Sequence, residues 1–220
     1  MTHDKAFLED KKSVKKDPYF LKSIISLLII FILISIMLFS FKYEKSLLFQ
    51  IAFIISVILV IFVAQKLLNI KIFEKTKYSI RDIYYIVAGY IAIIITDYVY
   101  GLFFSLETSN QVDIESSFQQ DPLILSIISL AIMPALIEEY IFRGLLLKVL
   151  FKNHLFIGVI ISSIFFALFH YSDNIFDYIP YFVSGLIFSI VYLKTQKLEV
   201  AIAVHFINNF IAVIMIFLNR

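Results

Sequence analysis

The sequence Pro134-Ala-Leu-Ile-Glu-Glu-Tyr-Ile-Phe-Arg143 places two adjacent carboxylates and one arginine inside an otherwise apolar run. An ionisable side chain at the centre of a bilayer costs on the order of 2.5–3.5 kcal/mol on insertion scales. Such side chains therefore face a protein interior or a wet cavity, and they mark functional sites by default. We expect Glu138, Glu139 and Arg143 to be enclosed by other helices.

The composition around this stretch is that of a polytopic membrane protein. Of the 220 residues, 61% are hydrophobic and 16% are charged, and the mean hydropathy is +0.92. The net charge of +2 is small, and the basic residues lie in short clusters between apolar runs, so nucleic acid is not an expected partner. The absence of cysteine excludes disulfides, cysteine-ligated zinc and thiol catalysis. We expect a multi-pass protein of a cell membrane, and abundant Ile, Phe, Lys and Tyr favour a bacterial plasma membrane.

Seven apolar runs are long enough to cross roughly 30 Å of hydrocarbon at about 1.5 Å per residue. They are Leu21–Phe41, Leu47–Ala64, Ile83–Phe104, Pro122–Leu147, Leu155–Tyr171, Tyr178–Leu193 and Leu198–Leu218, of which the sixth is the shortest. The sequence thus predicts an all-α fold, a bundle of about seven transmembrane helices. We divide it into a basic cytoplasmic tail (1–20, leading into an uncleaved anchor), N-terminal helices with their loops (21–121) and a C-terminal core (122–220).

The distribution of lysine and arginine predicts the orientation. The basic stretches are the tail, Lys66–Arg81, Arg143–Lys152 and Lys194–Lys197. They alternate with Ser105–Asp121 and Ser172–Asp177, which carry acidic residues and no lysine or arginine. Because cytoplasmic loops are enriched in basic residues, the N-terminus is expected inside and the C-terminus outside. The short Lys42–Lys45 turn fits this pattern less well.

Helical spacing predicts which polar residues lie on the same face of the helix. Glu139 and Arg143 are four residues apart, so they lie on one face and can neutralise each other. Glu138 points about 100° away and lacks that partner. Pro134 removes one backbone hydrogen bond just before the carboxylates, so a kink or a freed carbonyl is expected there. Alternatively, all three charged residues form a structural ion-pair cluster that fixes helix register. Asp97 in the third run is not assigned a role.

Two later segments supply histidines. His205 and Asn209 are four apart on one helix face, where either side chain can donate a hydrogen bond to a developing oxyanion. The same pair is equally explained as polar residues that form hydrogen bonds between helices. His170 ends its apolar run and has an alternative reading as an interfacial residue. Small residues spaced by four (Ser163 with Ala167, Gly185 with Ser189) predict close packing of the fifth and sixth helices.

Together these residues provide what hydrolysis requires. A carboxylate and a histidine can take a proton from water, and further donors can stabilise the tetrahedral intermediate. A zinc site of Glu138, His170 and His205 is the alternative, although the usual His-Glu-x-x-His spacing is absent. No serine lies in a nucleophile-elbow motif.

The motifs Glu138-Glu139-x-x-x-Arg143, Phe166-x-x-x-His170 and His205-x-x-x-Asn209, in this order, resemble the CAAX-processing and bacteriocin-processing (CPBP, or Abi) family of intramembrane endopeptidases. Phe182-x-x-Gly185 is a looser fourth element. The resemblance spans roughly 122–218 and implies that this part is the catalytic core.

The resemblance implies peptide-bond hydrolysis within the membrane. Glu138 and His170 match the pair that activates water, and His205 and Asn209 match the pair that stabilises the oxyanion. Glu139 and Arg143 match supporting positions. Both a metal-free glutamate mechanism and a zinc-dependent one are described for the family, and we favour the metal-free one.

The expected substrates are hydrophobic or membrane-associated peptides or proteins, such as bacteriocin or pheromone precursors or CAAX-like termini. One rival is a non-catalytic immunity or regulatory protein that binds a peptide or a sensor protein on the same scaffold. A second rival is a small ion-coupled transporter, because buried carboxylates and histidines also build proton relays.

Overall fold

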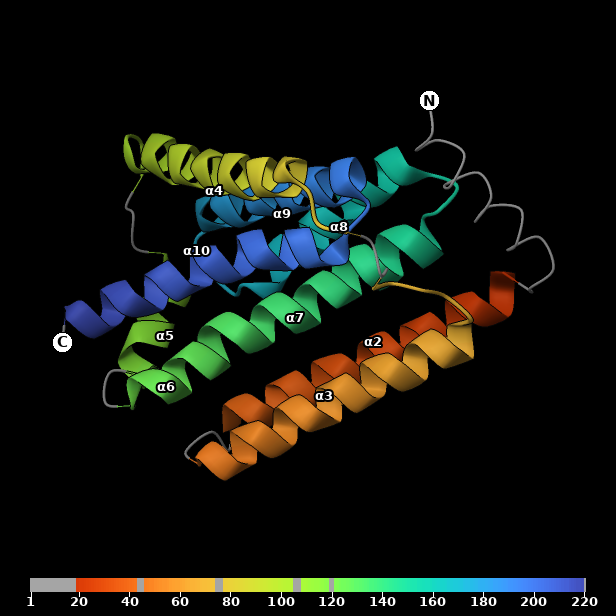
Figure 1. The fold of residues 1–220 in the computed structure, drawn as a ribbon. Coiled ribbons are helices and arrows are strands. Elements are labelled where there is room, and N and C mark those ends of the chain that lie inside the picture. The colour runs from red at the N-terminus through yellow and green to blue at the C-terminus, as the bar shows by residue number, and fades with distance from the viewer. Residues whose placement is uncertain (1–18, 43–45, 74–76, 105–107, 119–120, 220) are drawn as a thin grey trace.

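The computed structural model describes residues 19–42, 46–73, 77–104, 108–118 and 121–219. Nearly all of the basic tail, most of the Lys42–Lys45 turn, Lys75 and Glu107 lie outside the described residues. The helical elements are α2 (Tyr19–Lys42), α3 (Leu47–Leu68), α4 (Ile80–Gly101), α5 (Ser109–Phe118), α6 (Leu123–Ser126), η2 (Ile127–Ile132), α7 (Met133–Glu139), η3 (Tyr140–Leu150), α8 (Leu155–Phe169), η4 (Ile175–Asp177), α9 (Tyr178–Thr195) and α10 (Leu198–Leu218). Figure 1 shows their arrangement as an elongated bundle.

The seven predicted apolar runs all form helices, which confirms the polytopic helical bundle. Six helical stretches are long and apolar enough to cross a membrane, and α8 is a shorter apolar helix of 15 residues. At about 1.5 Å per residue, α8 is about 22 Å long, which is less than the roughly 30 Å of hydrocarbon. The expectation that the sixth run would be the shortest was therefore wrong. The fifth run ends early because His170 leaves the helical conformation (φ −96°, ψ 83°) before a polar turn.

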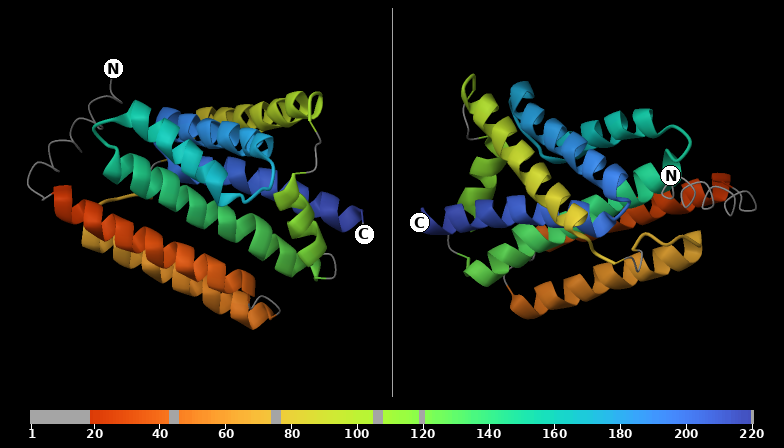
Figure 2. Two further views of the ribbon diagram at one scale, coloured as in Figure 1. Left: turned by 180° about the vertical axis from the view of Figure 1, so that it is seen from behind. Right: turned by 45° about the horizontal axis from the view of Figure 1, so that its top comes forward.

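The helices alternate in direction along the bundle. In Figure 1 and in both views of Figure 2, α2 begins at the end of the bundle opposite to the end where α10 finishes. The hairpin of α2 and α3 packs on η3 through α2, whereas α4, α9 and α10 pack on one another. This alternation agrees with an odd number of passes, and the assignment of the cytoplasmic side stays a prediction.

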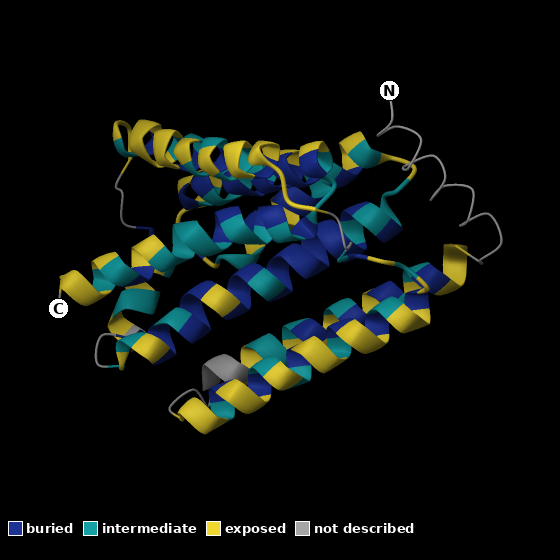
Figure 3. Cartoon of the chain, in the orientation of Figure 1, coloured by how far each residue is buried: buried dark blue, intermediate teal, exposed yellow. Residues whose placement is uncertain are grey.

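The elements α6, η2, α7 and η3 form one continuous helical rod through the centre of the bundle (Figure 1). Within an 18-residue apolar stretch of this rod 72% of the residues are buried, against 17–44% in the corresponding stretches of the other five candidate spans. Figure 3 shows the rod dark blue over most of its length, whereas α3 and α4 expose one face. The rod is thus the best shielded from lipid, which is why it can carry charged side chains.

Pro134 lies at the junction between η2 and α7. The backbone is π-helical before this junction, in η2, and again from Tyr140 onward, in η3. Wider π-helical turns are frequent at functional sites, and they shift the register of the side chains that follow. The disturbance expected near the proline therefore takes the form of a change in helix type, with Glu138 and Glu139 on the α-helical turns between the two π-helical segments.

A short helix, α5, occupies the connection that we expected to be an outward-facing loop. Thr108 stands before its first turn, where its Oγ1 accepts a hydrogen bond from the Gln111 backbone N–H at 3.3 Å. At the other end Phe118 is buried against Leu130 and Val213 in a small hydrophobic cluster. This helix was missed because its composition is mostly polar and it has only ten residues.

The predicted close packing of the fifth and sixth helices is confirmed for α8 and α9. A Cβ atom added to Gly185 of α9 would lie 2.9 Å from the Cα of Ser163 of α8. The Ser189 hydroxyl donates to the Gly185 carbonyl at 2.8 Å, and the Ser163 hydroxyl donates to the Val159 carbonyl at 2.8 Å. These serines thus satisfy their hydrogen bonding within their own helices, so the two backbones can approach.

Candidate active site

A fully buried ion pair joins Glu139 and Arg143, as their spacing predicted. Arg143 Nη1 donates to Glu139 Oε1 at 2.9 Å, and both side chains are 0% exposed. Arg143 Nη2 donates to the Gly185 carbonyl of α9 at 2.6 Å. The guanidinium therefore links the central rod to α9, at the point where α9 packs closely against α8.

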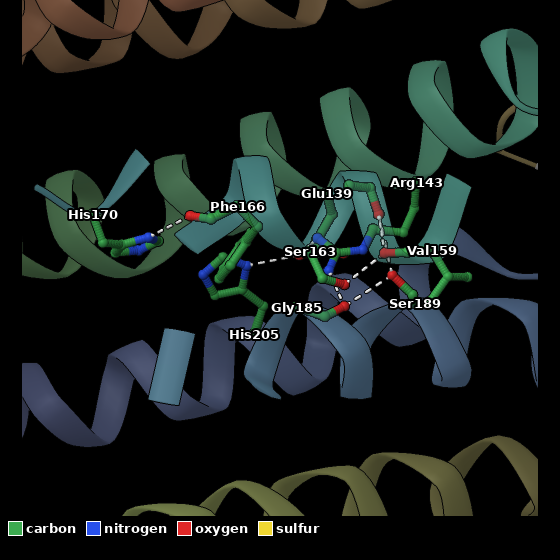
Figure 4. Close-up of polar contacts among 10 residues, drawn as sticks. Glu139, Arg143, Val159, Ser163, Phe166, His170, Gly185, Ser189 and His205 are labelled. Atoms are coloured by element: carbon green, nitrogen blue, oxygen red, sulfur yellow. Dashed lines mark hydrogen bonds and ion pairs between the residues drawn. The ribbon is translucent and has the colours of Figure 1, made fainter. Parts of the chain in front are cut away.

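His205 of α10 completes this cluster. Its Nδ1 lies 3.0 Å from Glu139 Oε1, the same oxygen that accepts from Arg143 (Figure 4). Because a carboxylate oxygen accepts, Nδ1 of His205 must carry the hydrogen. Glu139 thus holds residues from two helices, whereas the sequence predicted only its pairing with Arg143. We refer to Glu139, Arg143 and His205 as the charge cluster.

Aromatic rings enclose the charge cluster. The Arg143 guanidinium lies 5.1 Å from the centre of the Phe166 ring and 5.3 Å from that of Phe188. The His205 ring stacks on Phe188 with centroids 4.7 Å apart and planes at 14°. Cations are attracted to aromatic faces at these distances, and the attraction increases when water is excluded. The rings therefore keep the cluster dry and fix the plane of the imidazole.

Glu138 is buried beside the charge cluster but does not share its hydrogen bonds. Its side chain is 3% exposed, and its Oε2 has no hydrogen-bond partner among the described residues. Glu139, Arg143 and His205 all lie near enough to interact with it electrostatically. A buried carboxylate oxygen without a partner is expensive and requires an explanation. Oε2 of Glu139 also lacks a partner, but its Oε1 accepts from Arg143 and His205, whereas no hydrogen bond to Glu138 is found among the described residues; Glu138 is therefore the carboxylate best able to accept from water or substrate.

His170 reaches the same region from the end of α8. Its Nδ1 lies 2.9 Å from the Phe166 carbonyl oxygen (Figure 4). The Phe166 ring lies 4.9 Å from the His170 ring and 5.5 Å from the His205 ring, so it contacts both imidazoles. Within the described residues His170 and Glu138 have no direct hydrogen bond. The structure thus places His170 against Phe166, one of the rings that enclose the charge cluster. The pairing of His170 with Glu138 stays a prediction.

Asn209 lies one helical turn beyond His205 on α10 and is partly exposed. Its Oδ1 accepts from Asn208 Nδ2 at 3.4 Å, and no hydrogen bond joins it to the charge cluster in the described part of the chain. Its predicted role beside His205 is therefore not tested by this geometry. Asp97 is exposed on α4, outside the cluster.

The predicted zinc ligands do not form a ready donor set. Within the described ranges, no three His, Asp or Glu side chains are arranged so that they could hold a metal ion. The contacts of His205 with Glu139 and of His170 with the Phe166 carbonyl both use Nδ1, so Nε2 is the nitrogen that each ring could offer to a metal, but among the described residues the two Nε2 atoms and Glu138 form no such arrangement. The present geometry therefore does not fit a site formed by Glu138, His170 and His205, and we derive no step through a metal.

The fold and the charge cluster define a polytopic membrane protein with ionisable groups enclosed in its C-terminal helices. Residues 120–211 match the family model described as type II CAAX prenyl endopeptidase Rce1-like. This stretch, less than half of the chain, is similar to the CPBP family of CAAX proteases, and it contains every residue of the charge cluster together with Glu138, His170 and Asn209.

Two curated relatives are bacterial membrane proteins. The chain is 39% identical over 106 residues to "Membrane-embedded CAAX protease MroQ" of Staphylococcus aureus (strain USA300), a match that covers 44% of this chain and 41% of that protein. It is 30% identical over 119 residues to "Putative membrane peptidase YdiL" of Bacillus subtilis (strain 168), covering 54% of this chain and 46% of that protein. The matches thus span less than half of the length of these relatives. No solved structure gives a significant match.

Proposed function

We propose that the chain is an intramembrane endopeptidase that hydrolyses peptide bonds of membrane-associated peptides. The observation that carries this proposal is the unpartnered oxygen of Glu138, buried beside a cluster whose other charges are paired. A structural carboxylate in such a place would be expected to have a donor. A carboxylate that activates water needs a free acceptor, which Glu138 retains.

In this mechanism Glu138 and His170 act on one water molecule. A carbonyl oxygen can only accept, so the contact with Phe166 requires the hydrogen on Nδ1 of His170. Nε2 of the neutral imidazole then has its lone pair free. Glu138 takes a proton from water while Nε2 orients that water, and the water oxygen attacks the carbonyl carbon. The proton is then delivered to the leaving amine.

His205 and Asn209 are proposed as donors to the oxyanion. Because Nδ1 of His205 already donates to Glu139, Nε2 can donate only if the imidazole is protonated. Glu139 supports this role by accepting from Nδ1 of His205, and Arg143 supports it by holding Glu139 in place.

The substrate class follows from the membrane setting and from the relatives. Their names, a CAAX protease and a membrane peptidase, support a peptide or protein substrate at the membrane. We propose short hydrophobic peptides, such as bacteriocin or pheromone precursors, or CAAX-like termini.

One rival is also supported by an observation. The Glu139, Arg143 and His205 contacts would be equally useful as a structural tie between the rod, α9 and α10. In that case the chain is a binding protein, such as a bacteriocin immunity or regulatory factor, and Glu138 has no chemical role.

The test is cleavage of a pool of membrane-associated peptides by purified protein in nanodiscs. Wild type is compared with Glu138→Gln, His205→Ala and the control Glu115→Gln on α5, outside the site, each with and without a chelator. Removal of a general base is expected to lower the rate by about 10²–10⁴-fold, and removal of an oxyanion donor by about 10²–10³-fold. The control is expected to cleave like wild type.

The chelator separates the two hydrolytic mechanisms. Cleavage that resists the chelator supports the metal-free mechanism, whereas loss that zinc restores supports a zinc site at Glu138, His170 and His205. If Glu138→Gln keeps wild-type cleavage, Glu138 is not the base. If no peptide is cut and Glu138→Gln retains the full cellular phenotype, the binding protein replaces our proposal.

A further inference from the structure

Tyr181 of α9 lies directly against His170. The two rings are stacked with centroids 4.2 Å apart and planes inclined by only 14°. This is the closest and most parallel ring contact that His170 makes, since the Phe166 ring is 4.9 Å away and inclined by 43°. Tyr181 was not among the residues that the sequence singled out.

The other end of Tyr181 is held by the start of α5. Its hydroxyl lies 2.9 Å from the Thr108 Oγ1, and it accepts from Asn110 Nδ2 at 3.3 Å. The neighbouring Ser109 backbone N–H donates to the buried carboxylate of Asp177 at 3.1 Å. Tyr181 therefore lies between the imidazole of His170 and the start of α5. The start of α5 is in turn bonded to Asp177, just before α9.

The side chain of His170 needs a contact that fixes its orientation because of its position in the chain. It follows the last residue of α8, where its backbone has left the helix, so no following helical turn packs on its side chain. The hydrogen bond to the Phe166 carbonyl fixes one ring nitrogen but leaves the ring free to swing about that contact. A stacked ring on its face removes this freedom and determines where Nε2 points.

We propose that Tyr181 is a positioning residue for His170, held in place through its hydroxyl by Thr108 and Asn110. The inference rests on the proposed function, because it assigns Tyr181 the task of aiming Nε2 of His170 at the water beside Glu138. The ring supplies the stacking, and the hydroxyl ties that ring to α5. Losing the ring therefore has a larger effect than losing the hydroxyl.

The first test compares Tyr181→Leu, Tyr181→Phe and Thr108→Val in steady-state peptide cleavage. A misaligned catalytic group costs rate rather than binding, so Tyr181→Leu is expected to lower kcat by about tenfold to a hundredfold with little change in KM. Tyr181→Phe keeps the stacked ring and is expected to remain within about threefold of wild type, with Thr108→Val similar to it.

Tyr178→Leu is the matched control. Tyr178 is one turn earlier on α9 and bonds to the backbone of Ser172, and its ring has no contact with His170 in the described part of the chain. If Tyr181 acts only by holding the outer end together, Tyr178→Leu and Tyr181→Leu lower kcat alike, and the proposal is overturned. Wild-type kcat in Tyr181→Leu also overturns it.

A second readout does not depend on activity. The imidazole carbon-bound protons of His170, assigned by their loss in His170→Gln, are expected to be shifted upfield in NMR spectra by the Tyr181 ring. This shift persists in Tyr181→Phe and disappears in Tyr181→Leu. A His170 signal that is the same in all three proteins contradicts the stacking itself. If wild type cleaves no peptide, the proposed function fails, and the NMR comparison still decides whether Tyr181 fixes the ring.

Discussion

At the scale of single residues, Glu138 and Glu139 are adjacent carboxylates in opposite situations. Oε1 of Glu139 accepts from both Arg143 and His205, although its Oε2 has no partner, whereas Glu138 has no hydrogen bond among the described residues. Removing one member of a buried ion pair leaves an uncompensated charge, which is strongly destabilising. Neutralising a lone buried carboxylate instead removes a cost. The two neighbours should therefore respond oppositely to the same substitution.

We predict that Glu139→Gln lowers the free energy of unfolding by about 3–5 kcal/mol, because Arg143 is left buried without its counter-charge. Glu138→Gln is expected to leave stability unchanged or to raise it by about 1 kcal/mol while abolishing cleavage. Reversible unfolding in mixed micelles of detergent and SDS measures both. Equal destabilisation by the two variants would identify Glu138 as a member of a structural cluster.

A double-variant cycle gives a further prediction for the same pair. The double variant Glu139→Gln/Arg143→Met replaces both charged residues. It should lose less free energy of unfolding than the two single variants lose together, because no lone charge remains. The coupling is expected to be about 1–3 kcal/mol in the unfolding assay. Additive single effects would contradict the direct contact between these side chains.

The sequence predicted the local part of this site and not the rest. The pairing of Glu139 with Arg143 follows from a spacing of four along one helix, which is independent of how helices pack. The contact of His205 with Glu139 joins positions 66 residues apart. It depends on how α10 is rotated about its own axis, and spacing within α10 carries no information on that rotation. The stacking of Tyr181 on His170 was missed for the same reason.

At the scale of elements, hydropathy predicted the long helices well because lipid requires long apolar stretches with satisfied backbones. It overestimated α8, since hydropathy does not register the point at which His170 leaves the helix. It missed α5, whose stability depends on burying Phe118 against the rod and α10 rather than on its own composition. Elements that depend on tertiary contacts are thus the ones that sequence patterns predict least well.

The packing of α8 on α9 leads to a prediction about Gly185. A Cβ atom there would stand 2.9 Å from the Ser163 backbone, so the two helices must separate. Gly185→Ala is expected to destabilise the protein by about 1–3 kcal/mol, the usual cost of overpacking. Cleavage should fall as well, because the Gly185 carbonyl that holds Arg143 would move with its helix.

Gly89→Ala is the control for this substitution. The three atoms nearest to an added Cβ atom are side-chain methyl carbons of Val191 and Val204, at 3.2–3.3 Å, so small side-chain shifts can accommodate it. Its effect on unfolding should be under about 1 kcal/mol, with cleavage retained. If Gly185→Ala is no worse than Gly89→Ala, the close approach of α8 and α9 does not hold Arg143 in place.

At the scale of the whole molecule, one well-shielded rod explains why the charges lie where they do. The helices around the rod expose more of their residues to lipid, whereas 72% of the rod's 18-residue apolar stretch is buried. The site is therefore surrounded by protein although the chain is small. The short helix α8 decides the topology of this arrangement. If the chain passes through the membrane at α8, the two ends lie on opposite sides, and if α8 does not span, they lie on the same side.

We predict that α8 completes a membrane pass, with the end of α10 outside. The direction of the chain reverses at α8 as it does at the longer helices (Figure 1), and the connections Arg143–Lys152 and Ser172–Asp177 differ in charge as the two sides of a membrane require. The chain has no cysteine, so single reporters can be introduced at two exposed asparagines, in Asn153→Cys and Asn219→Cys. In intact cells a membrane-impermeant maleimide should label only the Asn219→Cys protein, and permeabilisation should expose the other. Labelling of neither reporter in intact cells would show that α8 does not complete a pass, and labelling of both, or of Asn153→Cys alone, would contradict this orientation.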